Sequence, residues 1–419
     1  MTPKERLLSS LNHKQPDRVC VDFGSTLVTG IAASTVSKLR KAVLGEGDYR
    51  VKVIEPYQML GEVDEKLREA LGVDVVGVIP PVTMFGFENK DWKPFTLFDG
   101  TDVLVPGEFN VKPTRDGGWY IYPEGDTSAK ASGRMPKDGF YFDAIPRQEP
   151  IEEDKLDPKD NLEEFGPVSD RLLESFKQQA EYANANSLGA VVSTPGTGFG
   201  DIALVPAMWM KRTKGIRDIE EWYVSTVTRR DYVLNIFKEQ CRIALDNLPK
   251  IAKAVGDKAQ AAFVTGTDFG MQTGLFISKA SYRDLFKPFH KAVNDYIHEN
   301  TNWKTFIHTC GSVIELIGDL IEAGFDILNP VQCTAANMDP RELKRQFGND
   351  IVFWGGGVDT QTTLPFGTPD QVYKQVRERI DIFNEGGGFV FNAIHNVQAS
   401  IGIDNVLAMF NALRDSRRS

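Results

Sequence analysis

The chain has few of the residues that define several large classes of protein. Only 4 cysteines occur in 419 residues, too few for a dense disulfide framework, so a special cysteine would serve as a metal ligand or a nucleophile. No apolar run approaches the roughly 20 residues that a membrane-spanning helix needs. The first residues also lack the apolar stretch of a signal peptide. We therefore expect a cytoplasmic protein without a membrane partner.

The chain also has fewer positively than negatively charged residues. The 48 Lys and Arg residues are outnumbered by 58 Asp and Glu residues, which gives a net charge of −10. No basic tract or interleaved basic and aromatic run is present, so nucleic acid is not expected as a partner. The contents of 41% hydrophobic and 25% charged residues are typical of a globular protein and argue against disorder.

What the chain does have is a regular alternation of strand and helix patterns. Such alternation is typical of βαβ units and a parallel sheet. Eight short runs rich in Val, Ile and Phe predict eight strands, which suits a single-domain TIM (β/α)8 barrel over residues 1–419. The predicted strands are 19–24, 74–79, 188–193, 259–265, 303–308, 325–329, 351–355 and 388–393.

Amphipathic segments between these runs predict the helices of the barrel. Asp218 is expected to cap the first, and Thr368 precedes the fourth. Residues 85–150 instead alternate aromatic and polar residues with turn signals at 98–100 and 116–120, so we expect a β-rich insertion between strands two and three. The predicted helices are 217–247, 281–299, 312–323, 370–384 and 404–415.

Barrel enzymes take their catalytic groups from the carboxyl ends of the strands, and two such ends carry metal-ligand side chains. His308 and Cys310 are two residues apart at the end of strand five, so they face the same way and could bind one borderline-soft cation such as zinc. His395, after strand eight, can supply a third ligand, and Cys333 is the alternative. An open fourth position would suit catalysis. The alternative without a metal is a locally hydrogen-bonded His308 beside a small buried Cys310.

Other polar side chains at the same strand ends are candidates for substrate or supporting roles. Asp268 could be a further ligand, a carboxylate behind the ligands or an acid and base, or could only cap its turn. Asp22 could bind substrate near the barrel axis or only cap the following loop. Four amide side chains could orient a small polar substrate or simply form other hydrogen bonds. They are Asn329, Gln332, Asn396 and Gln398.

Several motifs give the chain a resemblance to the uroporphyrinogen decarboxylase superfamily, which covers essentially its whole length. The superfamily includes the haem-pathway decarboxylase and the zinc- and corrinoid-dependent methyltransferases. The motifs are 4–12 (KERLLSSLN) with 16–18 (PDR), 307–311 (IHTCG) followed by 324–326 (GFD), 355–359 (GGGVD) and 404–408 (DNVLA).

The resemblance implies a choice between two kinds of enzyme. In the methyltransferase branch it implies a zinc site formed by His-x-Cys and a distant Cys; His308 and Cys310 match, and His395 stands where that last Cys is expected. The decarboxylase branch, which needs no metal, has a histidine in the same neighbourhood. Its arginine-rich segment after strand one is replaced here by residues 22–26 (DFGST), which would repel an acidic substrate.

The sequence therefore leads to one main hypothesis and two alternatives. The main hypothesis is a zinc-dependent methyltransferase that moves a methyl group between a small substrate and a thiol or a corrinoid, the corrinoid being supplied by a partner protein. The alternatives are a metal-free lyase of the decarboxylase kind and a non-catalytic barrel that binds a corrinoid or another small ligand.

Overall fold

The computed structural model describes residues 1–416, and its centre is a parallel sheet of eight strands nearly closed as a barrel. The hydrogen-bonded order is β1-β18-β17-β16-β15-β12-β11-β4. A hydrogen bond connects the two edges of this sheet: the backbone N–H of Asp74, just before β4, donates to the carbonyl of Val21 in β1 over 2.7 Å. All eight predicted strands are confirmed. They are β1 (Cys20–Val21), β4 (Val75–Val78), β11 (Gly189–Ser193), β12 (Ala261–Thr265), β15 (Lys304–His308), β16 (Ile327–Asn329), β17 (Val352–Trp354) and β18 (Phe389–Phe391).

The interior of the barrel is filled by side chains that alternate along the strands. Phe306 of β15 and Trp354 of β17 are both fully buried in this inner cluster and contact each other with ring centroids 5.1 Å apart. Leu7 and Leu11 of helix α1 (Pro3–Leu11) close the bottom. Because side chains two apart in a strand share a face, His308 points into the barrel like Phe306, but at its carboxyl-terminal mouth.

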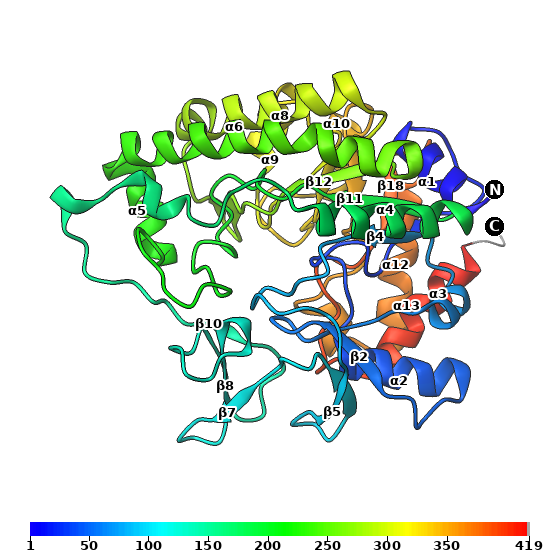
Figure 1. The fold of residues 1–419 in the computed structure, drawn as a ribbon. Coiled ribbons are helices and arrows are strands. Elements are labelled where there is room, and N and C mark those ends of the chain that lie inside the picture. The colour runs from blue at the N-terminus through cyan, green and yellow to red at the C-terminus, as the bar shows by residue number, and fades with distance from the viewer. Residues whose placement is uncertain (417–419) are drawn as a thin grey trace.

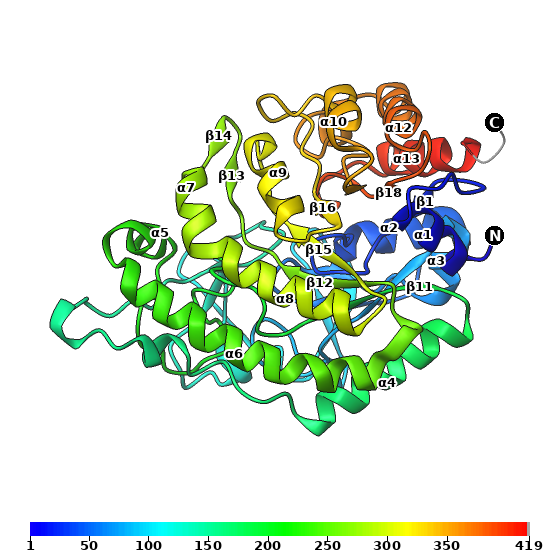
Figure 2. The same cartoon turned by 90° about the horizontal axis from the view of Figure 1, so that it is seen from above.

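Helices cover the outside of the strands, as the view from above shows (Figure 2). Asp218 caps its helix as predicted, with its carboxylate accepting from the Glu221 N–H, and Thr368 forms a capping box. The helices are α2 (Ala33–Leu44), α3 (Glu65–Leu71), α4 (Asp170–Ala185), α5 (Ile219–Thr228), α6 (Arg230–Val255), α7 (Lys279–Ser281), α8 (Lys287–Asn300), α9 (Ile314–Glu322), α10 (Pro340–Phe347), α11 (Thr363–Phe366), α12 (Pro369–Phe383) and α13 (Ile403–Asp415).

Two of the predicted helices are not continuous. The segment 217–247 is divided at Arg229, whose φ of −125° and ψ of 46° are not helical. Both halves are amphipathic and neither Gly nor Pro marks the break, so the hydrophobic pattern could not reveal it. The segment 281–299 opens with a π-helical turn, Tyr282–Phe286, before α8. Short 3-10 turns are Pro123–Gly125, Glu153–Lys155, Pro158–Asn161 and Gly256–Lys258.

In the described part of the chain, ten further short strands lie outside the barrel. One small sheet has the order β3-β2-β6-β5 and another β10-β9-β8-β7, and in Figure 1 they lie on the opposite side of the molecule from α6 and α8. The first sheet also uses residues that precede β4, which the sequence did not reveal. The strands are β2 (Val51–Glu55), β3 (Leu60–Gly61), β5 (Lys93–Thr96), β6 (Asp102–Val105), β7 (Val111–Pro113), β8 (Trp119–Ile121), β9 (Gly133–Met135), β10 (Asp143–Ala144), β13 (Gly270–Met271) and β14 (Gly274–Leu275).

No helix of residues 1–416 is both long enough and apolar enough to cross a bilayer.

Candidate metal centre and its cavity

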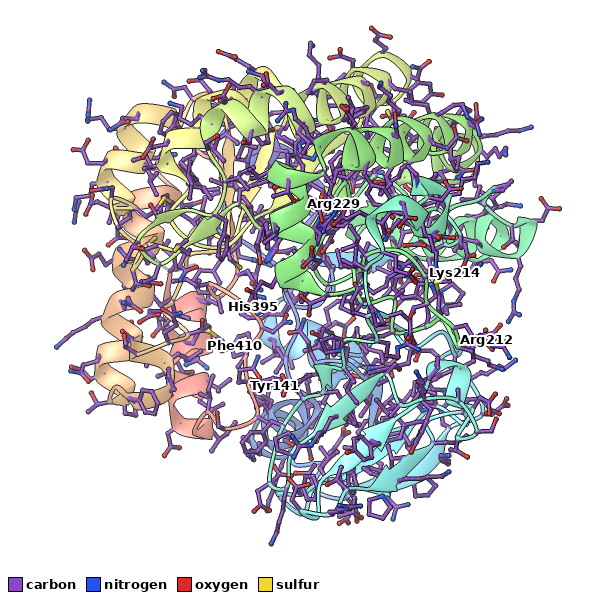
Figure 3. The ribbon with its side chains drawn as sticks, turned by 90° about the vertical axis from the view of Figure 1, so that its left-hand side faces the viewer. Tyr141, Arg212, Lys214, Arg229, His395 and Phe410 are labelled. Carbon is purple, nitrogen blue, oxygen red and sulfur yellow. The ribbon has the colours of Figure 1, made fainter. Side chains whose placement is uncertain are left out.

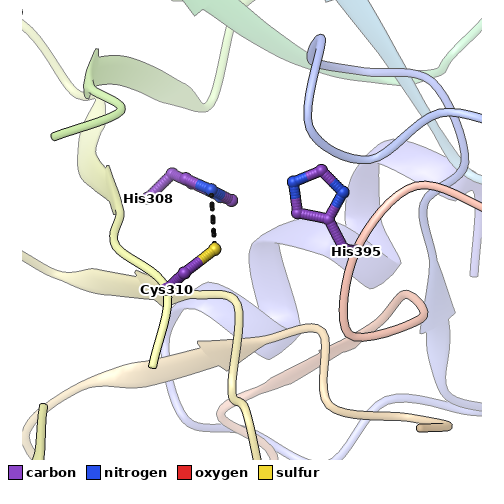
Figure 4. Close-up of side chains that lie close together, drawn as sticks. All are labelled: His308, Cys310 and His395. Carbon is purple, nitrogen blue, oxygen red and sulfur yellow. Dashed lines mark hydrogen bonds between the residues drawn. The ribbon is translucent and has the colours of Figure 1, made fainter. Parts of the chain in front are cut away.

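His308, Cys310 and His395 meet at the mouth of the barrel. One ligand atom from each lies within 4.8 Å of the others. The Cys310 Sγ is 3.4 Å from His308 Nε2, and the two imidazole centroids are 5.6 Å apart. Figure 4 shows His308 and Cys310 on one side and His395 approaching from the other. Residues 85 positions apart in the chain therefore converge as the sequence predicted.

The loop that carries His395 is held on both sides by backbone hydrogen bonds. The N–H of Ile394 donates to the carbonyl of Val358 over 3.1 Å, and the N–H of Val397 donates to the carbonyl of Gly30 over 3.0 Å. These bonds connect the loop after β18 with segments that follow β17 and β1. The imidazole is therefore placed by the closing strands of the barrel rather than by a free loop.

Asn329 determines which nitrogen of His308 faces the cluster. Its Nδ2 donates to the carbonyl of Trp354 over 2.8 Å, which leaves its Oδ1 to accept from His308 Nδ1 over 2.6 Å. His308 Nε2 therefore keeps its lone pair and directs it toward Cys310. Burial lowers the pKa of both His308 and His395 to about 4, so both imidazoles are neutral at pH 7.

The Cys310 loop is held just as tightly. Its backbone N–H donates to Asp268 Oδ1 over 2.6 Å, and the N–H of Gly311 donates to Gln332 Oε1 over 2.8 Å. Gly311 has a φ of +85°, and a Cβ there would lie 2.4 Å from the backbone of Gly270, so only glycine fits. Burial, with the Asp268 carboxylate, raises the pKa of the Cys310 thiol well above its usual range. Without a cation this sulfur remains a neutral thiol.

The donor set fits zinc. Two neutral imidazoles and a thiol that a cation would ionise are typical zinc ligands, and three protein ligands leave a fourth position for a reactant. Tetrahedral zinc needs ligand atoms roughly 3.3–3.7 Å apart, so the observed spread needs only a small closing movement. Cys333 is not part of the cluster, because its Sγ donates to the carbonyl of Val331 instead. Geometry therefore favours His395 over Cys333 as the third ligand.

A cavity of about 870 Å³ opens from this cluster, and His308, His395 and Asp268 line its inner end. In Figure 3, His395 lies toward the middle of the molecule, with Arg229 above it and Tyr141 of the inserted region below. The outer walls come from the β2 segment, from the loop after β4 and from the loop after β11. Segments outside the barrel and the mouth of the barrel thus line one cavity.

Two acidic residues of this cavity were not among the candidates predicted from the sequence. Glu55, 2% exposed, ends β2 and accepts from the N–H groups of Tyr57 and Gln58, and burial raises its pKa to about 7. Asp201 follows the glycine-rich loop after β11, and burial together with the charge of Asp268 raises its pKa to about 6. Asp201 lies in the loop after a barrel strand, the placement that led to the other candidates, whereas β2 was not recognised as a strand at all.

Asp22 and Asn329, predicted as candidate substrate-binding residues, hydrogen-bond to other residues of the protein and lie outside the cavity lining. Asp22 is fully buried and absent from the cavity lining; its Oδ2 accepts from the Ser25 hydroxyl over 2.7 Å and from the indole N–H of Trp354 over 2.9 Å. It is the cap of its loop, the alternative role considered for it. Asn329 supports His308 instead of meeting a ligand.

The other three amides are also occupied and lie outside the cavity lining. Gln332 holds the Gly311 N–H. Asn396 accepts from the N–H of Gly30 over 2.6 Å and donates to Gln58 Oε1 over 2.6 Å. Gln398 donates to the carbonyl of Asn396 over 3.4 Å. These amide side chains at the strand ends connect neighbouring loops. Buried polar groups need hydrogen-bond partners within the protein, and the amides supply them.

A comparison with known families gives a match to the C-terminal half of the chain. Residues 210–416 match the family model described as uroporphyrinogen decarboxylase (URO-D). Over these residues, just under half of the chain, the protein is similar to that family. The uroporphyrinogen decarboxylase match includes β12 to β18 and all three residues of the candidate metal centre, whereas Glu55 and Asp201 lie before it.

Comparisons over the whole chain give the fold. No curated protein matches the chain in sequence. Among solved structures, a methyltransferase from Methanosarcina mazei is similar over 99% of this chain and 99% of its own, with a TM-score of 0.54 and 13% sequence identity. At this identity the likeness concerns the arrangement of the elements, including those that precede residue 210.

Proposed function

We propose that the protein is a zinc-dependent methyltransferase of the uroporphyrinogen decarboxylase superfamily. It would move a methyl group between a small substrate and a thiol or corrinoid acceptor. The observation that carries the proposal is the convergence of His308, Cys310 and His395 at the inner end of a large cavity. The family match over the same residues and the likeness in fold to a methyltransferase support it.

The chain's own side chains suit this role. His308 Nε2, Cys310 Sγ and His395 would hold the zinc, with Asn329 keeping Nε2 free of a proton. The bound ion would supply Lewis-acid chemistry, lowering the pKa of a thiol or polarising the group that bears the methyl. Asp268 would hold the Cys310 backbone in place and face the ion's positive charge with its carboxylate.

The acidic cavity gives less support to the decarboxylase alternative. A substrate with several carboxylates needs cationic side chains, yet among residues 1–416 the cavity lining contains no lysine and only one arginine, Arg171. That arginine already pairs with Glu88. Like charges in a buried site repel, so such a substrate would be disfavoured.

Metal analysis of the purified protein tests the proposal first. We expect near-stoichiometric zinc in the wild type and in Cys333→Ser, the matched thiol control, and its loss in Cys310→Ser and His308→Ala. Circular dichroism establishes that each variant is folded. Zinc that persists in Cys310→Ser would contradict the assigned ligands.

Turnover is then measured with methylcobalamin and a panel of thiols. Transfer of the methyl group from cobalt to a thiolate yields a thioether and cob(I)alamin, which is visible in the absorption spectrum under anaerobic conditions. We expect the spectral change with zinc-loaded wild type and not with Cys310→Ser. A metal-free preparation with full activity would refute the zinc proposal, and tight corrinoid binding without turnover would identify a binding protein instead.

A further inference from the structure

The cavity has an unusual balance of charge. Among the residues that the structure describes, six carboxylates line it and a single guanidinium does, that of Arg171. Three of the six are neutralised by neighbours outside or at the edge of the cavity. Glu88 pairs with Arg171 and Lys90, Glu124 with Lys211 over 2.9 Å, and Glu164 with Arg217 over 2.7 Å.

The other three carboxylates have no such partner. Glu55, Asp201 and Asp268 form no ion pair with a lysine or arginine anywhere in residues 1–416. Asp268 holds the Cys310 loop and faces His395, so a metal ion in the candidate centre would balance its charge. Glu55 and Asp201 remain without a counter-ion. A buried carboxylate in this position is costly to ionise unless a ligand brings positive charge.

Aromatic side chains line the same cavity. Tyr57, Phe165, Trp209 and Phe263 all belong to its lining. Tyr57 follows Glu55 by two residues and lines the same cavity as Glu55 and Asp201. Burial, with nearby charges that include these two carboxylates, raises the pKa of its hydroxyl to about 12. Aromatic faces attract cations, most strongly when water is excluded.

We propose that this cavity binds a methylated ammonium ion, held by the negative charge of Glu55 and Asp201 and by the faces of the aromatic residues. A methylated ammonium carries its charge on an apolar surface, which suits a wall composed of both carboxylates and rings. The inference rests on the proposed function in one respect, because the ammonium ion would be the methyl donor. A thiolate acceptor would form the S–C bond as the C–N bond breaks, and the neutral amine would leave with the electron pair of that bond. The volume of about 870 Å³ leaves room for a second reactant beside it.

Isothermal titration calorimetry with two probes of nearly equal shape tests the proposal on the wild type. Choline and 3,3-dimethylbutan-1-ol differ in having a charged nitrogen or a neutral carbon at the same place. We expect choline to bind at least tenfold more tightly. Equal affinity for the two probes, or tighter binding of the neutral alcohol, would overturn the proposal.

Variants assign the binding to the two residues. Asp201→Asn and Glu55→Gln keep size and shape but remove the charge, and each is expected to weaken choline binding tenfold or more. Glu124→Gln is the matched control, because Glu124 is half exposed at the rim and already neutralised by Lys211. A similar loss in all three variants, or no loss in the first two, would refute the role of Glu55 and Asp201. Neutral-probe binding and circular dichroism establish that each variant is folded.

Zinc content measured in the same samples separates this inference from the proposed function. Stoichiometric zinc without choline selectivity would refute the ammonium site alone. Choline selectivity in a protein that binds no zinc would refute the zinc-dependent function alone.

Discussion

The floor of the cavity, formed by His308, Cys310 and His395, and its wall, which carries Glu55 and Asp201, hold their polar groups in different ways. On the floor, His308 and Cys310 are fixed by partners that leave one ligand atom of each directed at the same point. On the wall, Glu55 and Asp201 accept backbone hydrogen bonds but form no ion pair with any lysine or arginine of residues 1–416. Neutral nitrogen and sulfur donors suit an ion that stays, whereas unbalanced carboxylates suit a charged ligand that enters and leaves.

Removal of a floor ligand should have the largest effect. His395→Ala deletes one of three protein ligands, and we expect zinc affinity to fall by roughly a hundredfold or more, with methyl transfer near background. Competition with a chromophoric chelator measures the affinity. His298→Ala is the control, since His298 is on the surface and paired with Asp326. Unchanged affinity in His395→Ala would show that this imidazole faces the cluster without binding the ion.

Loss of the residue behind a ligand should have a smaller effect. Asn329→Ala removes the acceptor for His308 Nδ1, so the ring can turn or change its tautomer. Partners behind metal-bound histidines are typically worth about 10–100-fold in metal affinity, and we expect a loss in that range. The same chelator competition gives the value. Binding equal to that of the wild type would mean that packing alone orients the ring.

Substitution of Glu55 in the wall should instead change the stability of the fold. The pKa of Glu55 is about 7 in the folded chain and near 4.5 when unfolded, so between these values the folded state binds more protons. The free energy of unfolding therefore falls as pH rises from about 4.5 to 7. Glu55→Gln should be more stable than the wild type by about 1–2 kcal/mol at pH 8, because burial of the charge is avoided and one backbone hydrogen bond is weakened.

Urea denaturation at pH 5 and pH 8 measures this difference. The gap between Glu55→Gln and the wild type should shrink toward zero at pH 5, because Glu55 is neutral in the folded state there and pH 5 is close to its unfolded pKa of 4.5. A gap that is the same at both values would show that Glu55 does not titrate in this range. Choline at saturating concentration should reduce the gap at pH 8 by stabilising the charged wild type.

The sequence alone predicted much of the barrel and its metal-ligand pair. Short Val- and Ile-rich runs with helical patterns between them can form few other folds, and all eight strands lie where the pattern placed them. His308 and Cys310 share a face because alternate side chains in a strand always do. The break at Arg229 was beyond reach, since an amphipathic pattern continues across it.

Only the tertiary structure decided which polar residues reach the cavity. Asp22, Asn329 and Asn396 look like ligand-binding residues in the sequence, yet each is taken up by a neighbour that local sequence does not reveal. Glu55 reaches the cavity because β2 joins a sheet with a strand from beyond β4, a pairing between distant segments. Periodicity fixes the face on which a side chain lies, but long-range packing determines what stands opposite it, and that decides whether it binds a ligand or the protein itself.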